Sequence, residues 1–218
     1  MKHGYTNRTD RQGATVRKVY DGPDAAQRQA RERLALEALR GRFPVPRITG
    51  TGPGWLATEF VAGAHGQDLI DAGQAASVLA GCGRVLRQLH SLDPRLIAPG
   101  ATGDVVIQHG DFGPNNLLFG AEDGRVMAAL DWEFSGVGEA ITDIAWCEWI
   151  VRMHHPESVY ELPAFFDAYG SKPSWTSRQD EMVRRCRWLE DFTTQWDPAG
   201  PAAAVWRDRI RTVQHWEE

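Results

Sequence analysis

Several features are scarce or missing in this chain of 218 residues. No apolar run approaches the roughly 18 residues that suggest a membrane span, so we expect no membrane partner. The first eight residues are polar, which argues against a secretory signal. The three cysteines are too few and too scattered for a disulfide framework or a zinc site. These absences favour a reducing, cytoplasmic setting.

The composition is that of an ordinary globular chain, with 42% hydrophobic and 24% charged residues, which excludes a disordered protein. Charge is divided unevenly. Residues 1–108 contain 14 Lys and Arg against 10 Asp and Glu, whereas residues 109–218 contain 10 against 19. A basic half suits a polyanion such as a nucleotide phosphate, and an acidic half suits a cationic partner. The alternative is a chance asymmetry of solvated surfaces.

Hydrophobic spacing and turn formers divide the chain into a strand-rich first part and a mainly helical second part. We place the two domains at residues 1–62 and 63–218. The expected elements are a hairpin or loop at 4–13, strands near 14–20, 46–49, 55–61, 105–108 and 126–130, and helices from the turn at 21–24 to about Arg40, at 74–92 and from Ile141 onward. The fold class is therefore α+β, with two lobes of unequal size.

The strongest local signal is the stretch 107–119, which reads Ile-Gln-His-Gly-Asp-Phe-Gly-Pro-Asn-Asn-Leu-Leu-Phe. A polar loop joins two apolar strands, and Asp111 and Asn116 lie five residues apart within it. Asp131 ends the next apolar strand, where a hairpin can bring it beside Asn116. Oxygen ligands of this kind suit magnesium, which is held by one or two carboxylates plus substrate phosphates. The alternative is a pair of hairpins whose Asp and Asn side chains only satisfy turn geometry.

A second signal lies upstream, in the first expected strand and the helix that follows it. Alternation places Lys18 on the apolar face of the strand, where a cation needs a partner. Glu32 shares the apolar stripe of the helix, so an inward lysine and an inward glutamate predict an ion pair. In the alternative, Lys18 is solvated and Glu32 pairs with Arg28 or Arg31. If the register slips by one residue, Arg17 replaces Lys18.

This order of parts resembles the aminoglycoside phosphotransferase and choline kinase-like family, relatives of the protein kinases. The resemblance extends over most of the chain and fades after about residue 150. It implies a protein kinase-like fold, with a small antiparallel sheet and one helix in the N-lobe and a larger, mainly helical C-lobe. It also implies that Asp111 is catalytic, that Asn116 and Asp131 bind Mg²⁺, and that Lys18, fixed by Glu32, contacts the phosphates of ATP, with GTP as the alternative nucleotide.

The resemblance assigns further nucleotide-binding roles to five residues: Thr6 and Asn7 in a phosphate-covering loop, and Glu59, Phe60 and Val61 in the hinge whose backbone holds adenine. So few residues precede the loop that the family's usual first strand is expected to be almost absent.

Several histidines and one more aspartate are expected to be structural. Asp143 is expected to brace the catalytic loop by hydrogen bonds and His109 to orient it, rather than to do chemistry, and His90 is expected to be a structural histidine at a helix end. His154 and His155 have no partner at a metal-ligand spacing, so we expect both at the surface.

The acceptor is expected to dock on the helical lobe, which is rich in acids and tryptophans. The family phosphorylates small alcohols, among them aminoglycosides, choline and ethanolamine, and acids beside indoles suit amines. We therefore expect a small cationic acceptor, with antibiotic resistance as one biological setting. The acceptor-binding residues are expected to be Glu133, Glu139, Trp146, Glu190 and Asp191. The alternative is that most of the tryptophans are core residues and most of the acids are solvated.

Two other functions fit part of this pattern. One is a catalytically weak nucleotide-binding regulatory protein on the same fold. The other is a metal-dependent phosphoesterase with the His-Gly-Asp loop as ligands, which leaves Lys18, Glu32 and the hinge unexplained. In all three cases we expect no nucleic-acid partner and a monomer or a homodimer.

Overall fold

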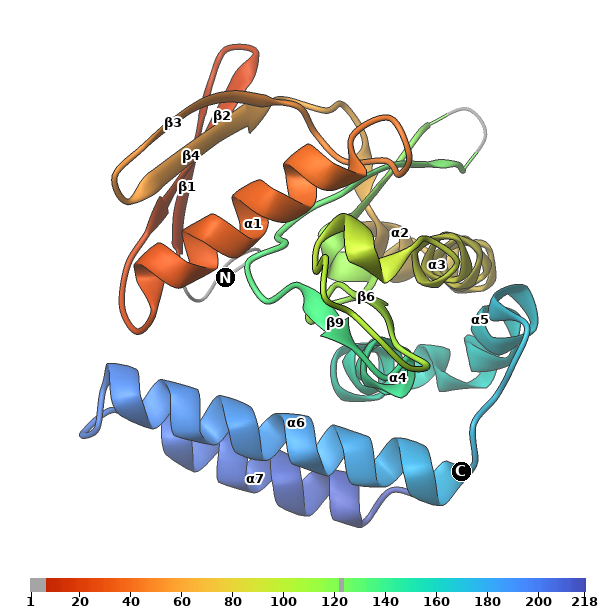
Figure 1. Ribbon diagram of the computed structural model, residues 1–218. Coiled ribbons are helices and arrows are strands. Elements are labelled where there is room, and N and C mark those ends of the chain that lie inside the picture. The colour runs from red at the N-terminus through yellow and green to blue at the C-terminus, as the bar shows by residue number, and fades with distance from the viewer. Residues whose placement is uncertain (1–6, 122–123) are drawn as a thin grey trace.

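The computed structural model describes residues 7–121 and 124–218. The first lobe is a four-stranded antiparallel sheet with one helix against it (Figure 1). In spatial order its strands are β1 (Asn7–Gln12), β2 (Thr15–Tyr20), β4 (Trp55–Glu59) and β3 (Ile48–Gly52), and the helix is α1 (Ala25–Leu39). Of the segment expected as a hairpin or loop, residues 7–12 form β1, a strand that pairs with β2 along its length.

The attachment of α1 to the sheet is partly polar. The side chain of Gln29 donates to the carbonyl oxygens of Gly52 and Trp55 and accepts from the amide of Gly54. The buried face of the helix consists of Arg28, Glu32, Ala35, Leu36 and Leu39. Its first two members are charged, so the end of this face nearest the N-terminus of the helix leads into an ionic site, and the other end forms core.

The second lobe is built mainly of helices. They are α2 (Gly66–Asp71), α3 (Ala75–His90), α4 (Ile141–His154), α5 (Leu162–Tyr169), α6 (Trp175–Trp196) and α7 (Ala202–Gln214), with 3₁₀ turns η1 (Pro94–Leu96), η2 (Pro114–Asn116) and η3 (Pro156–Glu161). Helices α3, α4 and α5 enclose the main core, in which Leu86, Cys147 and Phe165 are fully buried. Helices α6 and α7 pack against each other, and α6 also packs on α4.

Short strands between these helices position the central loop. They are β5 (Ala64–His65), β6 (Val106–Gln108), β7 (Leu117–Phe119), β8 (Val126–Ala129) and β9 (Gly136–Gly138). The antiparallel pairs β7–β8 and β6–β9 flank residues 109–116 and 130–135. Both expected strands, near 105–108 and 126–130, are therefore present, and the loops that follow them lie side by side.

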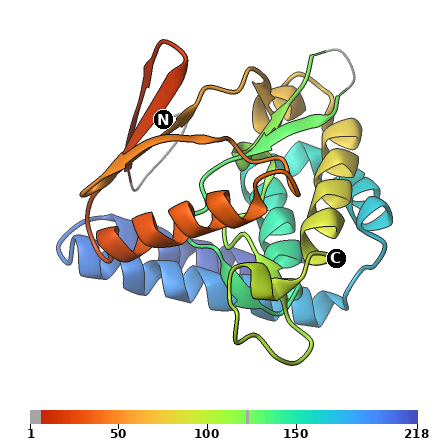
Figure 2. The same cartoon turned by 45° about the horizontal axis from the view of Figure 1, so that its top comes forward.

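The C-terminal end of α6 lies beneath α1 in both views, so this helix reaches back to the first lobe (Figures 1 and 2). The guanidinium carbon of Arg28 is 5.6 Å from the ring centre of Phe192 and 5.7 Å from that of Trp196. The ring of Trp196 is so close to Gly22 (φ +77°) that a Cβ there would lie 2.5 Å from it. A glycine is therefore required where the lobes meet.

Within the described residues, no helix has both the length and the apolar composition needed to cross a membrane.

Candidate active site

An ion pair joins the strand β2 to the helix α1. The Nζ of Lys18 is 2.6 Å from Oε2 of Glu32, and the hydroxyl of Tyr20 donates to the same oxygen at 2.6 Å. Arg17 is exposed and lies over the ring of Trp55, so the alternative strand register is wrong. The sequence therefore predicted this pair correctly; the role of Lys18 on phosphates stays a prediction.

Two more carboxylates surround the same lysine. The Nζ of Lys18 is 2.5 Å from Oδ1 of Asp131 and 3.6 Å from Oε2 of Glu133. Burial opposes a charge on Lys18, but the carboxylates of Asp131, Glu32 and Glu133 outweigh it and raise the pKa of Lys18 well above its usual value. Lys18 of β2 is therefore a fixed cation beside the loop that follows β8.

Glu133 was expected to bind the acceptor, and the structure corrects this expectation. Its side chain is 1% exposed, and its Oε2 accepts from Nη1 of Arg28 and from Nδ2 of Asn7, both at 2.7 Å. Arg28, an alternative partner for Glu32, thus pairs with Glu133 instead. The partner of Arg28 lies 105 residues further along the chain, so the spacing of residues within the helix could not identify it.

The backbone of the loop at 109–111 is held by two buried side chains. Asp143, which is fully buried, accepts from the amides of His109 at 2.7 Å and Gly110 at 2.8 Å, and from Nε2 of His90 at 3.3 Å. The ring of His109 contacts the carbonyl of Leu130 at 2.9 Å. These contacts agree with the expected roles of Asp143 and His109, and His90 is the last residue of α3, as expected of a structural histidine at a helix end. They also fix the loop at 109–111 relative to the loop that contains Asp131.

Asp111 is held at both carboxylate oxygens. Its Oδ2 accepts from Nδ2 of Asn116 at 2.9 Å, and its Oδ1 accepts from Nε1 of Trp146 at 2.7 Å. Burial, and then the negative charge of Asp131, raise the pKa of Asp111 to about 6, against the opposing effects of Arg185, Trp146 and Asn116. A carboxylate with a pKa near neutrality is suited to accept a proton from a hydroxyl.

Asn116 and Asp131 fit a divalent cation with oxygen ligands. The amide of Leu130 donates to the carbonyl oxygen of Asn116 at 2.8 Å, which holds the residues next to Asp131 against η2. Since Nδ2 of Asn116 donates to Asp111, a ligand role falls to its Oδ1. The side chain of Asp131 is 29% exposed and has φ +65°, a backbone conformation that is uncommon outside glycine. One carboxylate and one amide oxygen match the donors that Mg²⁺ takes from proteins beside phosphates.

Arg185 of α6 was not identified from the sequence. Its guanidinium donates to the carbonyl of Gly110 and lies 4.2 Å from the ring centre of Trp188, with Phe134 and Trp146 at 5.4 and 5.6 Å. Three aromatic rings thus surround the guanidinium of Arg185 beside the loop at 109–111. No local pattern in α6 signals this contact, because the partners come from distant parts of the chain.

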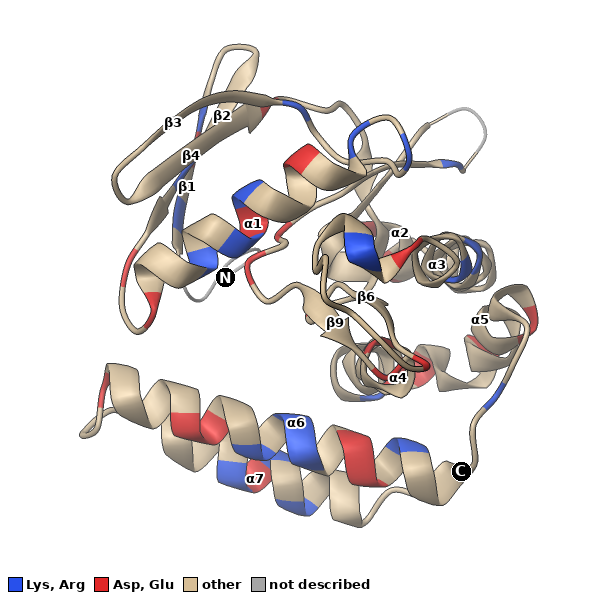
Figure 3. Ribbon diagram, in the orientation of Figure 1, with Lys and Arg blue, Asp and Glu red and all other residues tan. Residues whose placement is uncertain are grey.

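The other residues expected to bind the acceptor are dispersed. Trp146 is 4% exposed and stacks on Trp149 at 4.3 Å between ring centres, so it is a core residue whose indole N–H reaches Asp111. Glu139 and Asp191 are exposed, and Glu190 pairs with Arg207 at 3.0 Å. Acidic and basic residues alternate along α6 and α7 rather than forming one acidic face (Figure 3).

The expected nucleotide-binding residues of the first lobe are only partly assembled. The amide of Glu59 donates to the carbonyl of Arg47, and the amide of Phe60 to that of Ala14, so both N–H groups already have partners within the sheet. Val61 follows them at the lobe boundary. Thr6 lies outside the described residues. Asn7 is described, and it contacts Glu133 rather than standing apart in a loop.

Comparison with known proteins identifies a family and a curated relative that resemble this chain. The sequence matches the model of the phosphotransferase enzyme family over residues 2–104 and 95–180. The human acyl-CoA dehydrogenase family member 11 is 29% identical over 92 residues, which are 41% of this chain and 11% of that protein. The match therefore spans about a tenth of the length of this curated relative.

Two solved structures show the same fold at low identity. The choline/ethanolamine kinase family protein from Mesorhizobium loti has a TM-score of 0.64 at 16% identity, over 98% of this chain and 87% of that one. The gentamicin-APH(2")-IIa complex has a TM-score of 0.70 at 12% identity, over 97% and 89%. These likenesses confirm the expected two-lobed, protein kinase-like fold.

Proposed function

Because the chain belongs to the phosphotransferase enzyme family, we propose that it transfers the γ-phosphoryl group of ATP to a hydroxyl of a small molecule. One observation carries the proposal: the lysine of β2 pairs with the acid that follows β8, and the hydrogen-bonded pair in the loop at 109–116 is tied to the same segment by the hydrogen bond from the amide of Leu130 to the carbonyl of Asn116. The residues are Lys18, Asp131, Asp111 and Asn116. Phosphoryl transfer asks the protein mainly for positioning and charge neutralisation, and this group offers both.

In this proposal the nucleotide is held by residues 1–62 and the acceptor by residues 63–218. Lys18, kept in place by Glu32, binds the inner phosphates. Asn116 and Asp131 hold Mg²⁺, which supplies charge neutralisation on the phosphate oxygens when bound. At the hinge, the adenine edge is left to backbone groups around Val61, because the amides of Glu59 and Phe60 donate within the sheet.

Asp111 receives or orients the proton of the acceptor hydroxyl. Its two hydrogen bonds, from Asn116 and Trp146, fix the carboxylate in one orientation. With a pKa of about 6 it is ionised at neutral pH and remains basic enough to take a proton. The nearby guanidinium of Arg185 stabilises the ionised form.

The surroundings of Asp111 bear on the acceptor. The expected cationic acceptor requires unpaired acids near the reacting hydroxyl. Among the described residues proposed for that task, Glu133 pairs with Arg28 and Glu190 pairs with Arg207, whereas Arg185 is a cation whose charge acts on Asp111. This arrangement favours an acceptor without a cationic group beside its reacting hydroxyl; aminoglycosides fit only if their amines lie further away.

The test is turnover of Mg·ATP with a panel of neutral, acidic and amino alcohols, with the product identified by mass. We expect one class to gain 80 mass units, the addition of one PO₃H group, with release of ADP. Binding of ATP without transfer to any acceptor favours the regulatory alternative. Phosphate release that does not need a nucleotide favours the phosphoesterase.

A further inference from the structure

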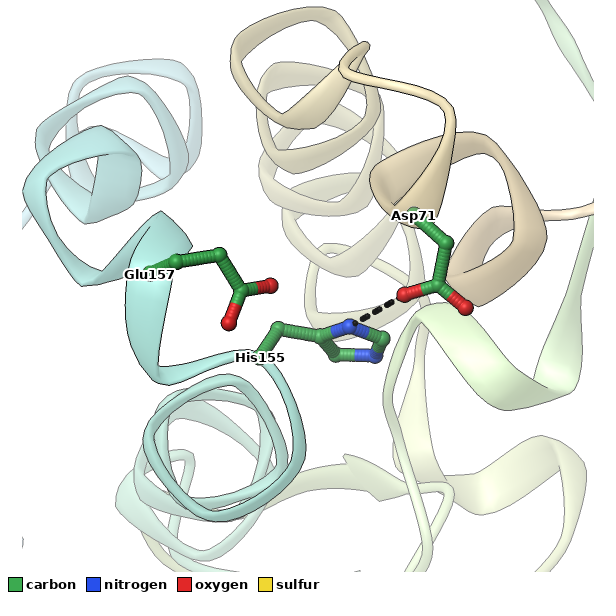
Figure 4. A group of neighbouring side chains, drawn as sticks. All are labelled: Asp71, His155 and Glu157. Carbon is green, nitrogen blue, oxygen red and sulfur yellow. Dashed lines mark ion pairs between the residues drawn. The ribbon is translucent and has the colours of Figure 1, made fainter.

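A cluster of three potential metal ligands lies away from the proposed active site. Asp71 is the last residue of α2, and His155 and Glu157 lie at the junction of α4 and η3 (Figure 4). One ligand atom from each residue lies within 4.8 Å of the others. The three side chains converge from two segments that are distant in the sequence.

His155 corrects an expectation from the sequence. It was expected at the surface, but it is 5% exposed, and its ring lies between the side chains of Asp71 and Glu157 (Figure 4). Its amide donates to the carbonyl of Val151, and its carbonyl accepts from the amide of Ser158, both at 2.8 Å. These hydrogen bonds fix the backbone from which the imidazole projects between the two acids.

The contact between His155 and Asp71 does not have the geometry of a hydrogen bond. Nδ1 of His155 is 3.0 Å from Oδ1 of Asp71, yet this buried nitrogen has no hydrogen-bond partner among the described residues. The two atoms are thus close together without a hydrogen bond between them. Two ligands of one ion lie in this way: tetrahedral zinc bonds of about 2.0–2.1 Å place the ligand atoms roughly 3.3 Å apart.

We propose that Asp71, His155 and Glu157 bind a divalent transition metal ion of the zinc type. One imidazole nitrogen and two carboxylate oxygens are ligands that zinc accepts, with water at a fourth position. A nitrogen ligand does not suit Mg²⁺, which prefers oxygen. The side chain of Asp71 is 66% exposed and Glu157 is also exposed, so both carboxylates can adjust around an ion beside the fixed imidazole.

The ion connects two supports of the catalytic loop. Just before α2, His65 contacts the carbonyl of Asn115 through Nδ1 at 2.9 Å. Helix α4 contains Trp146, whose indole donates to Asp111. A metal that links the end of α2 to the end of α4 therefore stabilises both sides of the loop, and it does so whether or not the proposed function is correct.

The experiment is titration of the untagged, metal-stripped full chain with ZnCl₂ by calorimetry. We expect one zinc site that Mg²⁺ does not compete for. Asp71→Asn and Glu157→Gln should each weaken zinc binding at least tenfold, and His155→Gln should abolish it. The matched controls His154→Gln and Asp68→Asn should bind as the unaltered chain does, because each replaces a neighbouring residue of the same type. Asp131→Asn should also leave this binding unchanged, which separates it from the proposed Mg²⁺ site.

A second readout is the melting temperature with and without zinc. Zinc should raise it for the unaltered chain and the controls but not for the three ligand variants, since a ligand that binds only the folded state stabilises it. If His155→Gln fails to fold, the two exposed carboxylates still decide the question. Zinc binding that is equal in Asp71→Asn, Glu157→Gln and the unaltered chain overturns the proposal, and so does an absence of zinc binding at micromolar concentrations.

Discussion

The phosphate side and the acceptor side of the proposed site are built differently. On the phosphate side, charges of opposite sign meet in pairs: Lys18 with Glu32 and Asp131, and Arg28 with Glu133. On the acceptor side, the cation Arg185 is surrounded by aromatic rings and donates to a backbone carbonyl. The first arrangement suits a polyanion with its counterion, whereas the second fixes one carboxylate, Asp111, and restricts what approaches it.

The largest expected effect is that of Asp111→Asn. We expect kcat to fall roughly 10²–10⁴-fold with little change in KM, because proton acceptance helps mainly in the transition state. Burial disfavours the charge of Asp111, so the amide should leave the melting temperature unchanged or higher, and steady-state kinetics beside a melting curve checks both. Near-full turnover would mean that Asp111 is not the base.

The next effect tests the phosphate side. Lys18→Met removes the cation among three carboxylates and should lower kcat/KM for ATP roughly 10²–10³-fold, as expected for a lost electrostatic contact to the transferring group. Arg17→Met is the matched control, since Arg17 lies on the opposite face of the same strand and is exposed. Equal losses in the two variants would contradict the assignment.

Arg185→Ala tests the acceptor side. Loss of its hydrogen bond to Gly110 should lower kcat roughly 10–100-fold, the equivalent of one hydrogen bond from a charged group. Its charge also holds down the pKa of Asp111, so the pH midpoint of activity should move upward. Arg187→Ala, an exposed neighbour on the same helix, should change neither quantity. A structural role alone predicts lower activity with an unmoved midpoint.

The pH profile of the unaltered chain gives a smaller effect near neutrality. Asp111 must be ionised to accept a proton, and its pKa is raised to about 6. Activity should therefore be full above pH 7 and fall about tenfold per pH unit well below pH 6. Initial rates at saturating Mg·ATP measure the profile. A rate that stays constant down to pH 4.5 would exclude this carboxylate as the base.

The smallest expected effect is that of Glu190→Gln and Asp191→Asn. Glu190 already pairs with Arg207, and Asp191 is exposed, so the KM for the acceptor should change less than twofold. Acceptor titrations with each variant measure this. A large rise in KM, confined to amino alcohols, would restore the cationic acceptor expected from the sequence.

Residues with a local signal were predictable from the sequence, and contacts between distant elements were not. Lys18 and Glu32 follow from the periods of a strand and a helix, Asp111 and Asn116 lie in one continuous motif, and Asp131 ends the next apolar strand. These signals are local, and the elements that contain them formed where expected.

The contacts missed from the sequence join distant elements. Arg185 reaches the loop from α6, Arg28 reaches Glu133 across the lobe boundary, and His155 contacts Asp71 at the end of α2. No period or spacing within one segment contains that information. The same reason explains why Glu133 was assigned to the acceptor. It lies two residues after Asp131, and only the folded chain shows that its carboxylate pairs with Arg28.

The most direct test of the central claim is the dependence of nucleotide binding on Mg²⁺, measured by calorimetry for the unaltered chain and for Asp131→Asn. If the acid after β8 and Asn116 hold the ion against the phosphates, the unaltered chain binds Mg·ATP more tightly than ATP alone, and Asp131→Asn loses that preference. An equal preference for Mg·ATP in both proteins would contradict the account.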